Sequence, residues 1–217
     1  MKTFFIEAKY GQKVVLPDEF IKKLPKEIAL FTTVQFIDSV DGIKKQLEKN
    51  NIKAKLFKAK NTKYPGQLIG CSIGKFDSKN FLYIGDGLFH PKALLLKNDA
   101  VVFVYNPFIK EYFELTQKDV GDMRRKQKAG LVKFLSSREI GVLISTKPGQ
   151  NKIDEARKLK KKYPDKNFYF LIFSTLDFTQ LENFNFIECF VNTACPRISY
   201  DDSEKIRKPV INIEDIS

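Results

Sequence analysis

Two cysteines of this chain stand in segments whose residue types suit thiolate or metal chemistry. Cys195 follows an apolar run and is itself followed by Pro196 and Arg197. Pro196 has no backbone N–H and disfavours helical conformations in the residue before it, so Cys195 is predicted to lie in a stiff, non-helical corner beside a cation. Cys71 closes a comparable turn-rich stretch, residues 64–71. Thiolates are nucleophiles and ligands of soft metals, and both cysteines are therefore candidate reactive or metal-binding groups.

The third cysteine, Cys189, is predicted to pack in the core. It falls inside the apolar run 187–191, which is typical of a strand, about 20 Å from Cys195 at ~3.3 Å per residue. Free cysteine is commonly a buried small hydrophobe. Three widely spaced cysteines argue against a disulfide framework, and a chain with no CxxC pair and with His90 as its only histidine is not expected to build a self-contained zinc site. Any metal therefore needs ligands from distant parts of the chain or from a second chain.

Polar and glycine-rich loops follow other predicted strands. They are residues 32–35 (TTVQ), 85–91 (GDGLFHP) and 145–150 (STKPGQ). The last loop leads into a predicted helix whose amino terminus can receive an anionic group, to which Lys147 adds a positive charge and Gln150 an amide. The middle loop carries His90 just before a proline. Each loop alone is consistent with ordinary turn geometry, but together with the cysteines they predict a shared cleft.

Apolar runs alternate with charged helical segments along the chain, a pattern typical of α/β proteins with parallel strands. The predicted strands are 28–31, 53–57, 81–84, 101–104, 141–146, 168–173, 187–191 and 210–213, and the predicted helices are 39–50, 118–137, 152–162 and 178–184. The order repeats, which predicts two tandem, similar, doubly wound (Rossmann-like) parallel-sheet domains, residues 1–115 with Cys71 and residues 116–217 with Cys195. Ligands of such sheets bind beyond the carboxyl ends of the strands, where the loops above lie.

Composition limits the class of protein. With 43% hydrophobic and 29% charged residues, the chain of 217 residues has an ordinary globular balance and enough length to bury a core. No run approaches the roughly 20 apolar residues of a membrane span, and the apolar run before Glu7 is too short for a signal peptide. We therefore expect a soluble, cytoplasmic protein with no membrane partner.

The charge balance is strongly basic. Lys and Arg number 38 against 26 Asp and Glu, which gives a net charge of +12. A basic surface attracts nucleic acid or an RNA-rich particle. The densest basic run, residues 157–162, lies on a predicted helix and is explained as its solvent face, and no interleaving of arginine with aromatic residues resembles a nucleic-acid motif. The sequence therefore does not require a direct nucleic-acid partner.

Six segments occur in the order found in a known family. They are residues 5–8, 32–35, 64–71, 85–91, 145–150 and 190–198, the last followed by the aspartates 201 and 202. These motifs resemble those of the archaeal 2-(3-amino-3-carboxypropyl)histidine synthases, which catalyse the first step of diphthamide biosynthesis. The resemblance covers about residues 4–215, nearly the whole chain.

The resemblance implies a cofactor and a reaction. Family members have three similar α/β domains, each of which gives one cysteine to a 4Fe-4S cluster, and S-adenosylmethionine binds at the iron left open. Cleavage of a carbon–sulfur bond yields a 3-amino-3-carboxypropyl radical, which is added to a histidine of translation elongation factor 2. Cys71 and Cys195 match the cluster cysteines of the second and third domains.

The resemblance and the loop positions together suggest the binding residues. Arg197, Lys147 and Gln150 are predicted to bind the carboxylate, amine or ribose of S-adenosylmethionine, with His90 as a polar wall of the same cleft. Phe36 departs from the family pattern, since it stands where the family usually has a histidine.

The resemblance covers the family's second and third domains but not its first domain. Residue 4 aligns where the second domain begins, so we expect the missing domain and its cysteine to come from another chain, either a first-domain protein or a second synthase subunit. Two other interpretations stay open. The chain could be a non-catalytic partner subunit of a diphthamide synthase complex, or a basic RNA-binding α/β protein.

Overall fold

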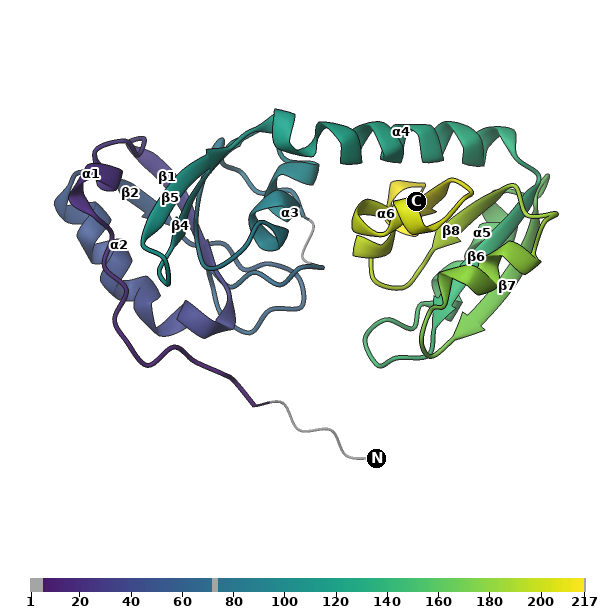
Figure 1. Ribbon diagram of the computed structural model, residues 1–217, viewed down its shortest axis with the longest axis horizontal. Coiled ribbons are helices and arrows are strands. Elements are labelled where there is room, and N and C mark those ends of the chain that lie inside the picture. The colour runs from purple at the N-terminus through teal and green to yellow at the C-terminus, as the bar shows by residue number, and fades with distance from the viewer. Residues whose placement is uncertain (1–5, 72–73, 217) are drawn as a thin grey trace. The chain divides into compact units, whose positions relative to one another are not determined.

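The computed structural model describes residues 6–71 and 74–216, and the chain divides into two compact units (Figure 1). Unit 1 is Met1–Val120 and unit 2 is Gly121–Ser217. The division falls after Val120, whereas the sequence predicts it after residue 115. Each unit has its own sheet and its own buried apolar cluster.

Unit 1 is built on a five-stranded sheet with the order β2-β1-β3-β4-β5. The strands are β1 (Glu27–Thr32), β2 (Lys53–Lys55), β3 (Asn80–Ile84), β4 (Val101–Asn106) and β5 (Glu111–Leu115). β1 to β4 are parallel, and β5 runs antiparallel to β4. Parallel strands buried on both faces have continuous apolar sequences, which is why β1, β3 and β4 are recognisable in the sequence.

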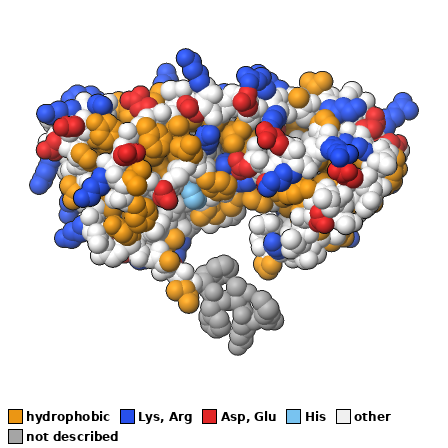
Figure 2. Space-filling model, viewed as in Figure 1, with side chains coloured by type: hydrophobic (Ala, Val, Ile, Leu, Met, Phe, Trp, Pro, Cys, Tyr) orange, Lys and Arg blue, Asp and Glu red, His pale blue; other side chains and the backbone are white. Residues whose placement is uncertain are grey.

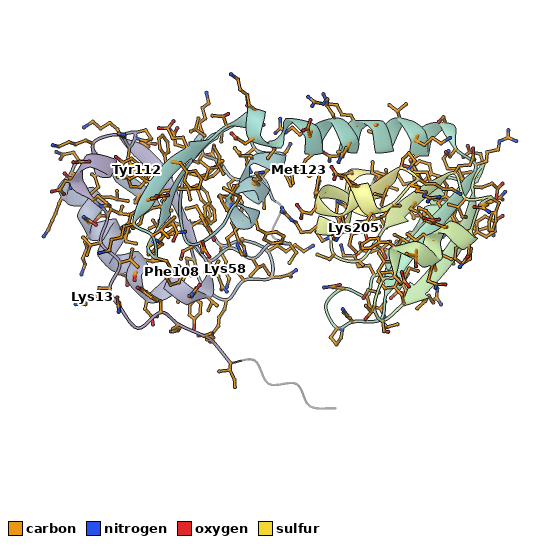
Figure 3. The ribbon with its side chains drawn as sticks, in the orientation of Figure 1. Lys13, Lys58, Phe108, Tyr112, Met123 and Lys205 are labelled. Atoms are coloured by element: carbon orange, nitrogen blue, oxygen red, sulfur yellow. The ribbon has the colours of Figure 1, made fainter. Side chains whose placement is uncertain are left out.

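The helices of unit 1 cover this sheet. They are α1 (Asp18–Ile21), α2 (Val40–Lys49) and α3 (Phe89–Lys97), with 3-10 segments η1 (Val34–Ser39) and η2 (Gln117–Val120). α2 buries Val40, Ile43 and Leu47, the apolar stripe that the sequence predicts. On β5, Tyr112 stacks on Phe20 of α1 with ring centroids 4.7 Å apart (Figure 3).

Unit 2 has a four-stranded, all-parallel sheet with the order β7-β6-β8-β9. The strands are β6 (Glu139–Ser145), β7 (Asn167–Phe173), β8 (Cys189–Asn192) and β9 (Val210–Asn212). The helices are α4 (Gly121–Ser136), α5 (Ile153–Lys162) and α6 (Arg197–Asp201), with 3-10 segments η3 (Phe178–Asn183), η4 (Ser203–Lys205) and η5 (Ile213–Asp215). In the part of the chain that the structure describes, no helix is long and apolar enough to cross a membrane.

The two sheets share one topology. The order β2-β1-β3-β4 of unit 1 matches the order β7-β6-β8-β9 of unit 2, and β5 is an addition to unit 1. In each unit the second strand lies on one side of the first strand, and the later strands lie on its other side. The point of reversal lies between β1 and β3 in unit 1 and between β6 and β8 in unit 2. Ligands of doubly wound sheets bind at the carboxyl ends of the strands that flank this switch point. The predicted α/β class with similar parallel-sheet units is confirmed.

Two elements of unit 1 differ from the sequence prediction. Residues 89–97 form α3, whereas the sequence suggests a loop around His90; five of its nine residues are buried, so it lacks the amphipathic pattern that reveals α2. Pro91 fits because it lies in the first helical turn, where no intrahelical donor is needed. β5 was not predicted, because Glu111 and Glu114 interrupt its apolar pattern.

Candidate functional site

The segment that carries Cys71 is anchored to the carboxyl end of β1. Thr32 donates its backbone N–H to the Gly66 carbonyl (2.8 Å), and Leu68 donates to the Thr32 carbonyl (2.7 Å). Gly66 has a φ of +77°, and a Cβ there would lie 3.3 Å from the Leu30 carbonyl oxygen, so both the conformation and the space favour glycine. The turn formed by residues 64–67 therefore starts the Cys71 loop beside the end of β1.

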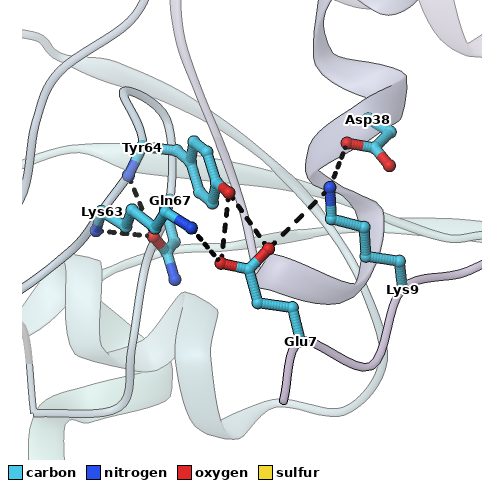
Figure 4. Close-up of polar contacts among 6 residues, drawn as sticks. All are labelled: Glu7, Lys9, Asp38, Lys63, Tyr64 and Gln67. Atoms are coloured by element: carbon cyan, nitrogen blue, oxygen red, sulfur yellow. Dashed lines mark hydrogen bonds and ion pairs between the residues drawn. The ribbon is translucent and has the colours of Figure 1, made fainter. Parts of the chain in front are cut away.

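The amino-terminal segment holds the same turn (Figure 4). The Glu7 carboxylate accepts hydrogen bonds from Lys63 Nζ (2.8 Å) and from the Tyr64 hydroxyl (3.0 and 3.1 Å). The Gln67 side-chain oxygen accepts the backbone N–H groups of Lys63 (2.8 Å) and Tyr64 (3.1 Å). The hydrogen bond from Lys63 holds the pKa of the Glu7 carboxyl below its usual value. Glu7, from the motif at residues 5–8, thus lies beside the motif at residues 64–71, although the two are distant in sequence.

Cys71 itself is exposed and lies near the switch point of unit 1. A Cβ built on Gly70 would lie 1.9 Å from Cε1 of Phe89, so the absence of a side chain lets this segment pass directly against the Phe89 ring. Phe89 is the first residue of α3, shortly after β3. The Cys71 loop therefore contacts both the end of β1 and the segment that follows β3, the two strands that flank the switch point.

His90 lies beside Phe89 in the first turn of α3 and packs on a buried tyrosine. Its ring is nearly parallel to that of Tyr83 on β3, at a centroid distance of 6.0 Å. Burial, and secondly the nearby Asp86 carboxylate, raise the pKa of Tyr83. The buried Tyr83 hydroxyl makes no hydrogen bond with the residues that the structure describes. Asn106 Nδ2 donates to Asp86 Oδ1 (2.8 Å), which ties the glycine loop to the end of β4.

In unit 2 a pair of buried amides holds the Cys195 loop. Asn192 Nδ2 donates to the Cys195 carbonyl (2.8 Å) and to Asn212 Oδ1 (2.8 Å), and Asn192 Oδ1 accepts from the Ala194 N–H (3.1 Å). Asn212 Nδ2 donates to the Pro196 carbonyl (3.0 Å). Asn192 and Asn212 are both 1% exposed and are register partners at the ends of β8 and β9. Three consecutive backbone groups around Cys195 are therefore fixed by two side chains.

These two asparagines are not among the site residues predicted from the sequence. Asn192 lies within a family motif, but Asn212 lies outside all six. Their common signal is a polar residue at the carboxyl end of a predicted apolar strand, where a buried amide must find hydrogen-bond partners.

Arg197 follows the cysteine corner as the first residue of α6 and is almost fully buried. Its guanidinium forms a bidentate ion pair with Asp201, in which Nη2 contacts Oδ1 at 2.8 Å and Nε contacts Oδ2. Such pairs have a fixed geometry. The structure thus gives Arg197 a partner one helical turn away and assigns a role to the first of the two aspartates after the motif.

Lys147 and Gln150 lie in the turn that follows β6. Gln150 donates its N–H to the Lys147 carbonyl (3.0 Å), and Gly149 has a φ of +77° after Pro148, the residue pattern of a type II turn. Lys147 is exposed and Gln150 is half-buried. This turn and the Cys195 loop leave the neighbouring strands β6 and β8, so they flank the switch point of unit 2.

Two further positions are core residues. Cys189 is fully buried, as predicted, and burial raises its pKa to about 12, so it does not suit metal ligation. Phe36 is also buried and packs against the rings of Tyr10 (5.2 Å) and Phe108 (5.5 Å), the last labelled in Figure 3. At this position the chain has an aromatic core residue, where the resemblance leads us to expect a histidine.

The donor chemistry fits a cluster ligand set that is shared among domains. Cys71 is exposed and Cys195 is half-buried, so both thiols have the access that ligation needs. Within residues 6–71 and 74–216, no group of three or more histidine, cysteine or acidic side chains is arranged to hold a metal ion. Each unit therefore offers one suitable thiol.

A cavity in unit 1 lies away from these residues. It has a volume of about 520 Å³ and is lined at the amino ends of β1, β3 and β4 by Glu27, Asn80 and Asp99. Lysines and acidic residues both line it, so it has no charge preference for one class of ligand. Because ligands of parallel sheets bind at the opposite, carboxyl edge, the cavity is not assigned a role.

The fold and these loops define a doubly wound α/β protein with cysteine-bearing loops at the ligand-binding edge of each sheet. The family model described as "Putative diphthamide synthesis protein" matches residues 1–217, and the chain belongs to this family. The resemblance drawn from the six motifs is confirmed.

Curated relatives and a solved structure agree with this assignment. The chain is 30% identical to the 2-(3-amino-3-carboxypropyl)histidine synthase of Pyrococcus horikoshii, over 90% of this chain and 58% of the relative. It is 28% identical to the protein of that name in Methanocaldococcus jannaschii, over 99% of this chain and 61% of the relative. The crystal structure of Dph2 from Pyrococcus horikoshii with a 4Fe-4S cluster matches with a TM-score of 0.77 and 29% identity, over 90% of this chain and 58% of that one. This chain thus spans about three fifths of the length of these relatives.

Proposed function

We propose that this chain acts in the first step of diphthamide biosynthesis. The reaction is the transfer of the 3-amino-3-carboxypropyl group from S-adenosylmethionine to a histidine of translation elongation factor 2, and the chain would act as part of the transferase. The observation that carries the proposal is that each unit presents an accessible thiol, Cys71 or Cys195, on a family motif at the ligand-binding edge of its sheet. A cytoplasmic location belongs to the same proposal.

Cys71 and Cys195 are the proposed ligands of a 4Fe-4S cluster. When bound, such a cluster supplies an electron and an open iron position for the cleavage of a carbon–sulfur bond of S-adenosylmethionine. Cys189 does not suit the role of third ligand, because it is fully buried and its pKa is raised to about 12. The third thiolate of the proposed ligand set therefore lies outside these two units.

The other residues have binding and positioning roles in this proposal. Lys147 supplies a positive charge to the carboxylate of S-adenosylmethionine, and Gln150 supplies an amide to its amine or ribose. Arg197 contributes to the same binding region, with Asp201 fixing its orientation. His90, which packs on Tyr83, is the polar residue proposed for the binding region in unit 1.

Partner chains are part of the proposal because the two units offer only two of the three thiolates that the family resemblance implies. Several relatives, among them the Encephalitozoon cuniculi protein (27% identical, over 85% of this chain), are named subunit 1 of the synthase. We propose that a first-domain protein or a second synthase subunit completes the ligand set, and that elongation factor 2 is the protein substrate.

Anaerobic reconstitution tests the proposal. The chain, alone and with a candidate partner, is loaded with iron and sulfide, and transfer of labelled 3-amino-3-carboxypropyl groups to elongation factor 2 is measured. We expect transfer that requires both chains and is abolished by Cys71→Ala or Cys195→Ala, while Cys189→Ala leaves it in place. Transfer by the partner alone, at the rate of the mixture, would contradict the proposal.

The same experiment separates a second function. Each unit offers only one suitable thiol, which is also compatible with a non-catalytic subunit of a synthase complex. In that case the chain would raise the activity of its partner, and neither Cys71→Ala nor Cys195→Ala would lower the stimulated rate.

A further inference from the structure

Each cysteine loop is joined to its sheet at a fully buried threonine, Thr32 in unit 1 and Thr193 in unit 2. Both residues are 0% exposed, and no other threonine that the structure describes is buried to that extent. A buried hydroxyl lowers stability unless it finds a hydrogen-bond partner. Both hydroxyls have one, and in each unit the partner is a backbone carbonyl of the strand on the other side of the switch point.

Thr32 is the last residue of β1 and connects two different neighbours. Its backbone N–H donates to the Gly66 carbonyl (2.8 Å) and its carbonyl accepts from Leu68 (2.7 Å), so both backbone groups are used on the side of the Cys71 loop. Its hydroxyl donates to the carbonyl of Ile84, the last residue of β3, at 2.7 Å. The side chain of Thr32 therefore makes the link to β3 for which its backbone groups are not available.

Thr193 makes the corresponding link in unit 2. It directly follows β8 and lies two residues before Cys195. Its backbone N–H (3.0 Å) and its hydroxyl (2.9 Å) both donate to the Leu143 carbonyl on β6. The beginning of the Cys195 loop is thereby fixed to the strand on the other side of the switch point.

The switch point is the part of each sheet where such a link has the most effect. The chain leaves the two flanking strands in different directions there, which opens the crevice in which doubly wound sheets bind their ligands. If the two strand ends moved apart, the cysteine loop joined to them would move as well. A hydroxyl that bonds across the strand ends opposes this movement in both units.

Charged contacts at the surface are less suited to fixing these loops. Figure 2 shows Lys and Arg side chains spread over the face in view, with acidic side chains among them. Water and salt screen contacts between such groups. A hydrogen bond in the interior is stronger because the local dielectric is low, and it keeps one partner. The places of the cysteine loops therefore depend more on the buried hydroxyls than on surface charge.

We propose that Thr32 and Thr193 are positioning residues, which fix the places of Cys71 and Cys195 through the ends of the strands. Their role in cluster binding rests on the proposed function, whereas their effect on the two loops does not. Groups that bind a metal centre need supporting hydrogen bonds that hold them in place, and removal of such support weakens metal binding. Neither threonine is expected to touch the metal centre or the substrate.

Amide hydrogen exchange of the metal-free chain tests the two loops separately. Thr32→Val keeps the shape of the side chain but removes the donor, so the Leu68 amide, which bonds to the Thr32 carbonyl, should exchange at least about tenfold faster. Thr193→Val should have the same effect on the Ala194 amide. Each variant is the matched control of the other, because the amide in the opposite unit should keep its wild-type rate. Amides in the middle of β4 and β6 report whether each unit stays folded.

Conservative variants and the loaded complex add readouts that a merely structural role would not change. Thr32→Ser and Thr193→Ser restore the hydroxyl and should restore slow exchange. After anaerobic loading with iron and sulfide beside a candidate partner, we expect both Val variants to hold less iron or to shift the electron paramagnetic resonance signal of the reduced cluster. Both Ser variants should match the wild type.

Two results would overturn the proposal. One is wild-type exchange of the loop amides in both Val variants. The other is faster exchange with unchanged iron content and an unchanged signal, because the hydroxyls would then stabilise the sheets without placing the cysteines. A wild-type chain that takes up no iron contradicts the proposed function instead, and the exchange rates of the metal-free chain then decide whether the threonines fix the loops.

Discussion

The two units have the same strand order but carry their cysteines at different points of it. In unit 1 Cys71 lies in the connection between β2 and β3, before the third strand of the repeat. In unit 2 Cys195 lies after β8, which is the third strand of that repeat. Both loops nevertheless reach the carboxyl ends of the strands at the switch point. The two cysteines therefore lie at the same edge of their sheets, although they follow different strands of the repeat.

The two loops are also held by different forces. The Cys71 loop depends on backbone hydrogen bonds to Thr32 and on exposed contacts of Glu7. The Cys195 loop depends on a buried amide pair and on the ion pair of Arg197. Buried polar groups lose more when a partner is removed, because water cannot replace it. The loop in unit 2 should therefore be the more sensitive to single substitutions.

The largest effect is expected from Asp201→Ala. The change leaves the Arg197 guanidinium, whose side chain is 5% exposed, without its carboxylate partner. Arg197 is buried but the Asp201 side chain is 28% exposed, so breaking this pair should lower the free energy of unfolding by about 2–3 kcal/mol, measured by urea denaturation. The neighbouring Asp202 is a matched control, because its pair with Lys205 is exposed, so Asp202→Ala should cost roughly 0.5 kcal/mol or less. Equal losses in the free energy of unfolding for the two variants would show that the Arg197–Asp201 ion pair adds no special stability.

The second-largest loss of stability is expected when the Asn192–Asn212 amide pair is broken. Asn192→Ala removes the hydrogen bonds to Cys195, Ala194 and Asn212 and should lower the free energy of unfolding by about 2 kcal/mol. The control is Asn106→Ala in unit 1, where one amide contacts Asp86 and the Phe108 N–H, and we expect about 1 kcal/mol. A larger loss in the free energy of unfolding for Asn106→Ala than for Asn192→Ala would contradict the greater sensitivity expected for unit 2.

A pH titration examines the contacts that hold the Cys71 loop. The pKa of the Glu7 carboxyl is lowered from 4.5 in the folded chain, so its contribution to stability is present above pH 4.5 and is lost as the pH falls through the lowered pKa. Hydrogen exchange of residues 63–68 should therefore be slower in the wild type than in Glu7→Gln at neutral pH, with the difference vanishing in acid. A difference that persists at all acidic pH values would show that the carboxylate charge is not responsible.

The smallest effect is expected from Tyr83→Phe. The Tyr83 hydroxyl is buried and makes no hydrogen bond with the described residues, so its removal should change the free energy of unfolding by no more than about 0.5 kcal/mol, or raise it. Tyr64→Phe removes a hydroxyl that donates to Glu7 and should be the more destabilising of the two. Thermal unfolding of both variants measures the difference.

Much of the fold can be predicted from the sequence, because buried parallel strands and the amphipathic helix α2 have simple patterns. α3 cannot, since residues buried all around a helix leave no period to detect. β5 cannot either, because its glutamates resemble those of an exposed segment.

The candidate site can likewise be predicted from the sequence only in part. Cys71, Cys195 and the turn of Lys147 and Gln150 are recognisable because their residue types are unusual at strand ends. The residues that position them are harder to find. Asn212 becomes meaningful only when β9 is placed beside β8, and Asp201 only when a helical turn brings it to Arg197.

The central claim is that Cys71 and Cys195, and not Cys189, bind the cluster. Alkylation of each cysteine, mapped by mass spectrometry in the native chain before and after anaerobic loading with iron and sulfide in the presence of its partner, tests it directly. We predict that Cys71 and Cys195 react in the metal-free chain and are both protected after loading, while Cys189 stays unreactive throughout because it is buried. A loaded complex in which Cys71 or Cys195 still reacts at its metal-free rate would contradict the account.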